Sequence, residues 1–190
     1  MDQENLTAFP GGYAGARPPQ QPPFQPPPRE PKTAPWVWAM RIVFTLCLFW
    51  TTAFIFKNSL QIAEVSSARS HDIMETINKL LGVVGIGPLS EYIVRKLAHF
   101  GEFALLGFWF MLCLRVYTRR FVRHVSWPLF FGLLVAVLDE TVQLYVPGRS
   151  SSVRDVLIDF AGVLAGLFAA LLILLFVRMC TILWKDRKEL

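Results

Sequence analysis

The sequence has few charged residues for its length. Only 17% of its 190 residues are Asp, Glu, Lys or Arg, whereas 54% are hydrophobic. Charged residues normally make up about 25% of a soluble globular chain. The hydrophobic residues also occur in blocks of about 20, the length that crosses a ~30 Å hydrocarbon core as a helix. The composition argues against an ordinary soluble domain and predicts an integral membrane protein.

Cysteine and the common catalytic motifs are also scarce. Cys47, Cys113 and Cys180 lie in or beside hydrophobic blocks, and this odd, widely spaced set argues against a disulfide framework or a zinc site. The chain has no HExxH motif, paired histidines or nucleophile elbow, so no motif predicts an enzyme, a metal or a cofactor. The net charge of +5 comes with basic residues beside the hydrophobic blocks. This placement favours membrane topology and anionic lipid over nucleic acid as its explanation.

Proline and glycine mark the organisation of the chain. They are concentrated in residues 1–35, which predicts a disordered or polyproline cytoplasmic tail. Residues 36–178 form the predicted membrane domain, and residues 179–190 a basic cytoplasmic tail. The predicted transmembrane helices are Trp36–Phe56, Ile93–Tyr117, Trp127–Tyr145 and Val156–Val177. The expected fold is therefore an all-α bundle of four transmembrane helices.

The link between the first two predicted helices contains an amphipathic pattern, "DIMETINKLLGVV". Its hydrophobic residues share one helical face: Ile73, Ile77, Leu80, Leu81 and Val84. Asp72 followed by Glu75 resembles a capping box, which predicts that the helix begins there. We expect a short helix that lies on the membrane surface or covers the bundle.

Lysine and arginine predict the orientation of the bundle. The last turn of the second predicted helix and the link after it contain four arginines and no acidic residue, and the C-terminal tail is also basic. The link between the third and fourth helices contains only two arginines. The positive-inside rule then places both termini in the cytoplasm. Four tryptophans fall at the predicted cytoplasmic ends, as an aromatic belt would: Trp36, Trp38, Trp127 and Trp184.

This orientation brings three polar stretches to the outer face of the membrane. "RKLAHFGE" opens the second helix, "DETVQLYVPGR" closes the third, and "SSVRDVLID" opens the fourth. Arg95, His99 and Glu102 share one helical face, and Asp139 and Gln143 share another. The sequence therefore predicts a cluster of ionisable residues near the outer ends of the helices.

The fourth helix carries a stripe of acidic and small residues. Asp155, Asp159, Gly162 and Gly166 follow one another at i, i+4, i+7 and i+11. The two glycines form a GxxxG pattern, which allows another helix to approach closely. The carboxylates should therefore face the interior of the bundle rather than lipid.

The link between the third and fourth helices should fold back over the bundle. Pro147 and Gly148 predict a tight turn that brings Arg149 over the helix ends. The expected countercharges for the carboxylates are Arg95, Lys96, Arg149 and Arg154.

Three interpretations of the cluster remain open. An ionisable group inside the hydrocarbon costs roughly 2.5–3.5 kcal/mol on insertion scales, so such groups predict a function. In the first, the cluster binds a headgroup or another ligand, with these candidate residues: Arg95, Lys96, Gln143, Arg149, Asp155 and Asp159. In the second, it is catalytic, or it holds a divalent cation, with these candidates: His99, Glu102, Asp139 and Glu140. In the third, the charges only fix the register of the helices.

The motifs resemble the VanZ-like family of membrane proteins. The resemblance is carried by "KLAHFGEFALLG" and "LLVAVLDETVQLYVPGRSSSVRDVLIDFAGVLAG", within roughly residues 42–177. The matching positions are Lys96, His99, Glu102, Asp139, Glu140, Gln143, Pro147, Gly148, Arg149, Asp155, Gly162 and Gly166. The chain departs from the pattern at Phe103, where tyrosine is common, and at Asp159, where asparagine is usual.

The resemblance implies a bacterial multipass protein of the cytoplasmic membrane that acts at the cell envelope. The best-known member of that family is linked to resistance to the glycopeptide teicoplanin. The implied partners are the lipid bilayer and an envelope lipid or cell-wall precursor. A membrane-embedded hydrolase or transferase acting on a lipid-linked substrate is the alternative, and a scaffold is the third. The sequence shows no internal repeat of a transporter, although it is compatible with a homo-oligomer.

Overall fold

The computed structural model describes residues 34–83, 87–118 and 120–189. The chain divides into residues 1–32 and residues 33–190, and the second unit holds the whole described structure. The tail predicted over residues 1–35 therefore lies almost entirely outside the described residues. Within them the secondary structure is helical and contains no strand, which confirms the expected all-α class.

Four helical segments are long and hydrophobic enough to cross a membrane. The helices in chain order are α1 Pro35–Ser59, α2 Ala63–Val83, α3 Glu91–Tyr117, α4 Phe121–His124, α5 Ser126–Gln143 and α6 Val153–Glu189. The spans are α1, α3, α5 (with α4 just before it) and α6. The predicted number and order of transmembrane helices are therefore confirmed.

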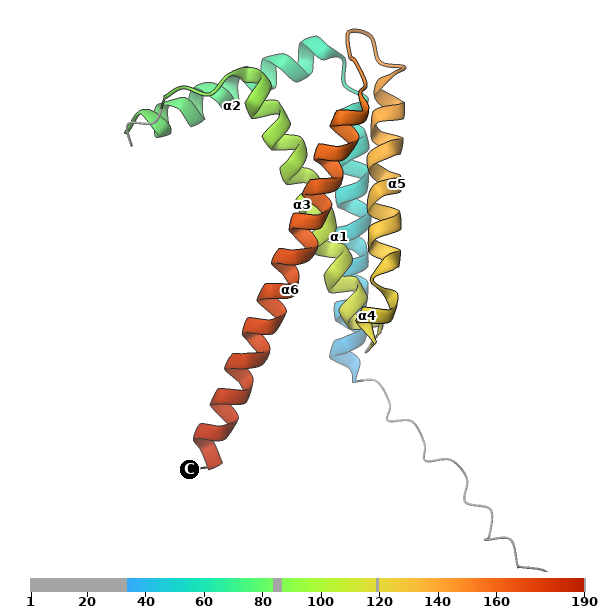
Figure 1. The fold of residues 1–190 in the computed structure, drawn as a ribbon, viewed down its shortest axis with the longest axis vertical. Helices are drawn as coiled ribbons and strands as arrows, with labels where there is room; N and C mark the ends of the chain where they lie inside the picture. The colour runs from blue at the N-terminus through green and yellow to red at the C-terminus, as the bar shows by residue number, and fades with distance from the viewer. Residues whose placement is uncertain (1–33, 84–86, 119, 190) are drawn as a thin grey trace, which may run out of the picture. The chain divides into compact units, whose positions relative to one another are not determined.

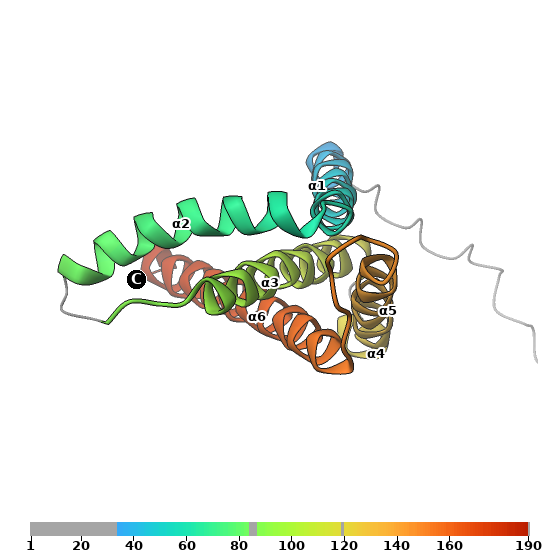
Figure 2. The ribbon, with the colours of Figure 1, turned by 90° about the horizontal axis from the view of Figure 1, so that it is seen from above.

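Helix α3 is the centre of the bundle, since it contacts α1, α5 and α6 (Figure 2). Its closest approach is to α6, where glycines, which have no side chain, allow the two backbones to come into contact. A Cβ atom built at Gly166 would lie 1.8 Å from the Ala104 carbonyl oxygen, and one at Gly162 would lie 2.6 Å from that of Phe100. Gly107 makes the reciprocal approach from α3. The predicted glycine pattern therefore forms a helix-packing seam, as expected of small residues in membranes.

Helix α2 begins earlier than the sequence predicted. Asp72 lies inside the helix, which starts at Ala63, so the expected capping box at Asp72 is wrong. Figure 1 shows α2 running across the ends of the spans, in a direction transverse to them. Of its predicted apolar face, Ile77 and Leu81 are half-buried, Ile73 is exposed, and Val84 lies outside the described residues. This transverse position suits the expected surface helix.

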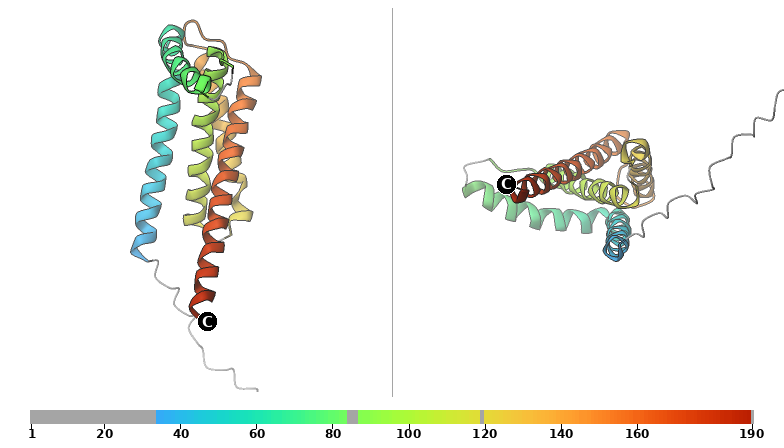
Figure 3. Two further views of the ribbon diagram at one scale, coloured as in Figure 1. Left: turned by 90° about the vertical axis from the view of Figure 1, so that its left-hand side faces the viewer. Right: turned by 90° about the horizontal axis from the view of Figure 1, so that it is seen from below.

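Helix α6 is longer than predicted. It continues past Val177 to Glu189, so the predicted basic tail is part of the same helix. Its 37 residues would extend about 55 Å at 1.5 Å per residue, well beyond a ~30 Å hydrocarbon core. Beyond Ala170 no residue of α6 whose side chain is described is buried. Figure 3 shows this end of α6 extending past the ends of the other spans.

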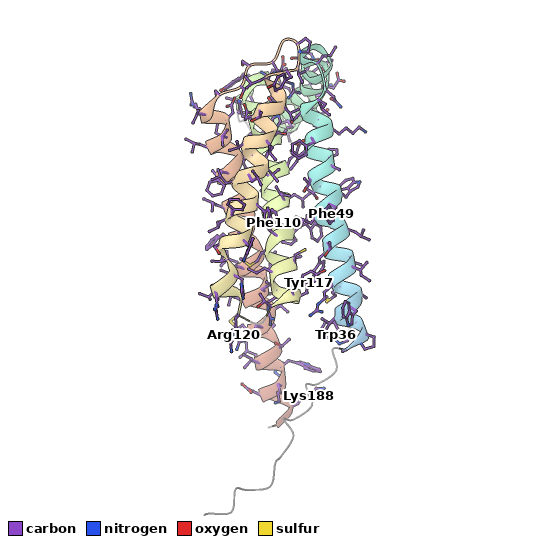
Figure 4. The ribbon with its side chains drawn as sticks, turned by 90° about the vertical axis from the view of Figure 1, so that its right-hand side faces the viewer. Trp36, Phe49, Phe110, Tyr117, Arg120 and Lys188 are labelled. Atoms are coloured by element: carbon purple, nitrogen blue, oxygen red, sulfur yellow. The ribbon has the colours of Figure 1, made fainter. Side chains whose placement is uncertain are left out.

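The end of the spans near the C-terminus carries aromatic and basic side chains. Figure 4 places Trp36, Tyr117 and Arg120 at this end. Arg41 donates from Nε to the Val116 carbonyl oxygen at 3.0 Å, and its guanidinium lies over the Tyr117 ring. These contacts fasten α1 to α3 at a level where aromatic residues and arginine commonly meet the lipid headgroups.

Candidate functional site

Four helix ends meet at the opposite end of the spans. The C-terminal ends of α1 and α5 lie beside the N-terminal ends of α3 and α6 (Figure 1). This is the convergence that the three polar stretches predicted, with the end of α1 as a fourth contributor. The predicted site residues are therefore brought together. Some of them line a cavity, and others bond to the end of α1.

The link between α5 and α6 folds as a tight turn. The Arg149 N–H donates to the Val146 carbonyl oxygen at 3.2 Å, and Gly148 between them has φ of 78°. Proline followed by a glycine with positive φ is the pattern of a type II turn. As expected, the turn returns Arg149 over the helix ends, where its Nη2 donates to the Asn58 carbonyl oxygen at 3.1 Å.

Glu140 of α5 anchors the link through a hydrogen bond to its backbone. Its Oε2 accepts the backbone N–H of Ser152 at 3.1 Å, and the Ser152 hydroxyl accepts the N–H of Asp155 at 3.2 Å. Ser152 therefore caps the start of α6 while its own N–H is bound by α5. Glu140, one of the catalytic candidates, therefore has a structural partner, and its side chain also lines the cavity described below.

Asp139 is fully buried and joins α1 to α5. One carboxylate oxygen accepts the Ser59 hydroxyl, and the other accepts Nε2 of Gln143 at 2.8 Å. Gln143 lies one turn further along the same helix, so the predicted shared face of Asp139 and Gln143 is confirmed. The fully buried serine on α1 is a partner that the sequence did not indicate.

Glu102 also bonds to the end of α1. Its Oε1 accepts Nδ2 of Asn58 at 2.8 Å, and Glu102 is not among the residues that line the cavity. The predicted face of α3 therefore divides, since Arg95 and His99 line the cavity while Glu102 contacts α1. Asn58 and Ser59 end a hydrophobic segment, and their composition resembles an ordinary helix end. The one sequence signal that could have predicted their role is that two polar residues stand next to each other at the end of the helix.

A cavity of about 340 Å³ opens between α3, α5, α6 and the link. Its basic side chains are Arg95, Lys96, Arg149 and Arg154, and its acidic ones are Glu140, Asp155 and Asp159. One ion pair crosses it, from Lys96 Nζ to Asp155 Oδ1 at 2.5 Å. Cavities of this size lie within the range of about 300–1,000 Å³ typical of ligand sites.

The buried end of the site is acidic. Asp139, Glu140 and Asp159 are all buried, and each offers a carboxylate oxygen within 4.8 Å of the others. His99 lines the cavity, and in the part of the chain that the structure describes its buried Nδ1 has no hydrogen-bond partner. Buried polar atoms are normally bonded, so such an atom calls for an explanation. Carboxylates at this spacing could hold a divalent cation or exchange a proton with a ligand.

The basic side chains of the cavity are less buried than its carboxylates Glu140 and Asp159. Burial lowers the pKa of the Arg149 guanidinium, the nearby Asp139 opposes this effect, and the positive charge of Arg95 adds to it. An arginine nevertheless stays protonated in proteins. The cavity therefore offers fixed positive charges on its less buried side chains and carboxylates on its buried ones, an arrangement that can hold an anion and hydrogen-bond donors together.

Comparison with known proteins identifies a family for this chain. No curated protein and no solved structure is significantly similar to this chain. A family model described as VanZ/LLP1 matches residues 41–176, which is more than half of the chain. The matched region runs from α1 to α6 and includes every residue assigned above to the polar site. This chain belongs to the VanZ/LLP1 family.

Proposed function

We propose that the polar cavity binds the phosphate of an envelope lipid headgroup. The observation that carries this proposal is the set of arginines around the cavity. Among the described residues, Arg95 and Arg154 form no ion pair, and Arg149 donates to a backbone carbonyl rather than to a carboxylate. An arginine fork can bind two phosphate oxygens at once, which a lysine cannot do.

The carboxylates limit what the rest of the headgroup can be. Glu140 and Asp159 line the same cavity as the arginines. An ionised carboxylate accepts hydrogen bonds and does not donate them. The portion of the ligand beyond its phosphate should therefore carry donors, such as the hydroxyls of a sugar or an amine. Phospholipids and lipid-linked cell-wall precursors both meet this requirement.

The side of the membrane is part of the proposal. Basic residues in the link after α3 and near the end of α6 favour a cytoplasmic position for that end of the bundle. The cavity would then face the outside of the cell. A protein that engages lipid headgroups there would reduce the access of a lipophilic glycopeptide such as teicoplanin to its target.

Binding of a lipid phosphate should depend on the arginines. We expect the purified chain to bind polyprenyl phosphate more tightly than the uncharged polyprenol, by native mass spectrometry. Arg95→Gln with Arg154→Gln should weaken binding of the phosphate by about a hundredfold or more, since each charged hydrogen bond contributes roughly 1.5–3 kcal/mol. Teicoplanin susceptibility of a host expressing the same variants measures the cellular consequence.

The matched control is Lys57→Gln with Lys79→Gln. Both lysines are exposed, belong to helices α1 and α2 and lie outside the cavity lining. If the control weakens binding as much as the arginine variant, the effect reflects general surface charge. Equal affinity for the phosphate and the alcohol would also contradict the proposal.

A membrane-embedded hydrolase or transferase is the second candidate. It is favoured by the three buried carboxylates within 4.8 Å of one another and by His99, which lines the cavity and whose Nδ1 has no hydrogen-bond partner among the described residues. In this reading a carboxylate acts as general base and His99 as general acid, at a phosphate held by the arginines.

The two candidates predict different results for one experiment. Purified protein would be incubated with polyprenyl diphosphate and Mg²⁺, and release of inorganic phosphate would be measured. Turnover that is lost in His99→Gln, while binding persists, would favour catalysis. Binding without any release from the wild-type protein would eliminate the enzymatic candidate and leave headgroup binding.

A further inference from the structure

A second cavity lies between α3 and α6, near the other end of the spans. Its volume is about 620 Å³, and its walls are mostly apolar side chains, among them Met111, Leu171 and Leu174. Arg115 of α3 and Arg178 of α6 line it as well. Neither belongs to the polar site described above, so this cavity is a separate feature.

The cavity forms because the two helices separate. Their glycines hold the backbones together as far as Gly107 and Gly166. Beyond this region α6 moves away from α3 towards its own C-terminus, as Figure 1 shows. Ala170 is the last residue of α6 known to be buried, and the apolar residues after it face the widening space or the outside. The groove is therefore open towards lipid.

The two arginines lie at similar distances along their helices. Arg115 stands 24 residues after the start of α3 at Glu91, and Arg178 stands 25 residues after the start of α6 at Val153. At 1.5 Å per residue each is about 36–38 Å along its helix. A bilayer is about 40–45 Å thick with its headgroups, so both guanidinium groups fall at headgroup depth.

We propose that this groove binds one anionic phospholipid of the leaflet on that side. An acyl chain would lie along the apolar wall, and the phosphate would lie between Arg115 and Arg178. Both arginines are exposed, and in the described residues neither forms an ion pair. Basic pockets between transmembrane helices are a known mode of binding anionic headgroups. Charge complementarity therefore favours this occupant over a neutral lipid or a second copy of the chain.

The surroundings strengthen the positive field. No acidic residue occurs between Glu102 and Asp139, whereas the link after α3 is rich in arginine. Figure 4 places Arg120 and Lys188 at the same end of the molecule as the groove. An anionic headgroup would find no competing carboxylate on the α3 wall of this groove. The proposal does not depend on the ligand of the polar cavity.

Lipid retention tests the proposal directly. The full chain would be reconstituted in vesicles of equimolar phosphatidylglycerol and phosphatidylcholine, extracted in mild detergent and examined by native mass spectrometry. We expect one phosphatidylglycerol to be retained in preference to phosphatidylcholine. Arg115→Gln with Arg178→Gln should reduce that retention about thirtyfold, which corresponds to two headgroup contacts.

Two further variants make the result decisive. Arg120→Gln with Arg123→Gln removes the same charge at the same end, outside the cavity lining, and should reduce retention far less than the groove variant, because these arginines contribute only to the surrounding field. Leu175→Trp would fill the groove from an exposed position while keeping both arginines, and should lose the lipid. Equal loss in the Arg120 and Arg123 control, equal retention of phosphatidylcholine, or a dimer that protects the groove from lipid would overturn the proposal.

Discussion

Replacing Gly166 with alanine should remove most of the folded protein, whereas the same change at Gly101 should leave it intact. A Cβ atom at position 166 would lie 1.8 Å from the Ala104 carbonyl oxygen and 2.8 Å from the Phe108 nitrogen. These are backbone atoms of α3, which cannot rotate away as a flexible side chain can. The helices must separate, and we expect a loss of about 3 kcal/mol in the free energy of unfolding.

Gly101 is the matched control because a Cβ atom there would meet nothing within 4 Å. It lies on α3, near the same seam, but is exposed. Alanine at this position should be neutral or slightly stabilising, since glycine is a poor helix former. The measurement is the yield of monodisperse protein in detergent and its thermal unfolding midpoint. A wild-type midpoint for Gly166→Ala would show that close backbone contact is not needed.

Replacing Asp139 with alanine should cause a loss of similar size for a different reason. The change leaves the Ser59 hydroxyl and the Gln143 amide without their acceptor in a fully buried place. Each unsatisfied buried group costs about 1–3 kcal/mol. The same substitution at Asp72, which is exposed on α2, should have little effect on the unfolding midpoint.

A double-mutant cycle separates this network from a general loss of packing. Ser59→Ala added to Asp139→Ala removes the stranded hydroxyl, so the combined loss should be smaller than the sum of the two single losses. Strictly additive losses would mean that the two side chains do not interact. The cycle also tests the scaffold interpretation, in which the buried acidic residues stabilise the packing of the helices and do not bind a ligand.

The sequence predicted the parts of the fold that depend on local pattern. The stripe formed by Asp159, Gly162 and Gly166 follows from helical periodicity alone, and the structure packs it against α3. The turn at Gly148 follows from the backbone preferences of two residues, Pro147 and Gly148. In both cases the physical cause lies within a few residues of the feature, so a single sequence carries the information.

The features that the sequence did not predict depend on partners far away in the chain or on the absence of residues that end a helix. The roles of Asn58 and Ser59 depend on their hydrogen bonds to Glu102 and Asp139, which lie 44 and 80 residues away in the sequence. Helix α6 was predicted to end at Val177 because its hydropathy falls there. Polar residues do not end a helix by themselves, and the stretch to Glu189 contains neither proline nor glycine.

The bonds at the end of α1 also bear on the order in which the chain is made. Helix α1 leaves the ribosome first, but Asn58 and Ser59 find their partners on α3, on α5 and finally on Arg149 of the last link. Until that link is synthesised, this end of the first helix lacks the last of its three partners. The polar cavity therefore cannot close before the link and the start of α6 have been made, and a chain interrupted before Arg149 would hold α1 only through its contacts with α3 and α5.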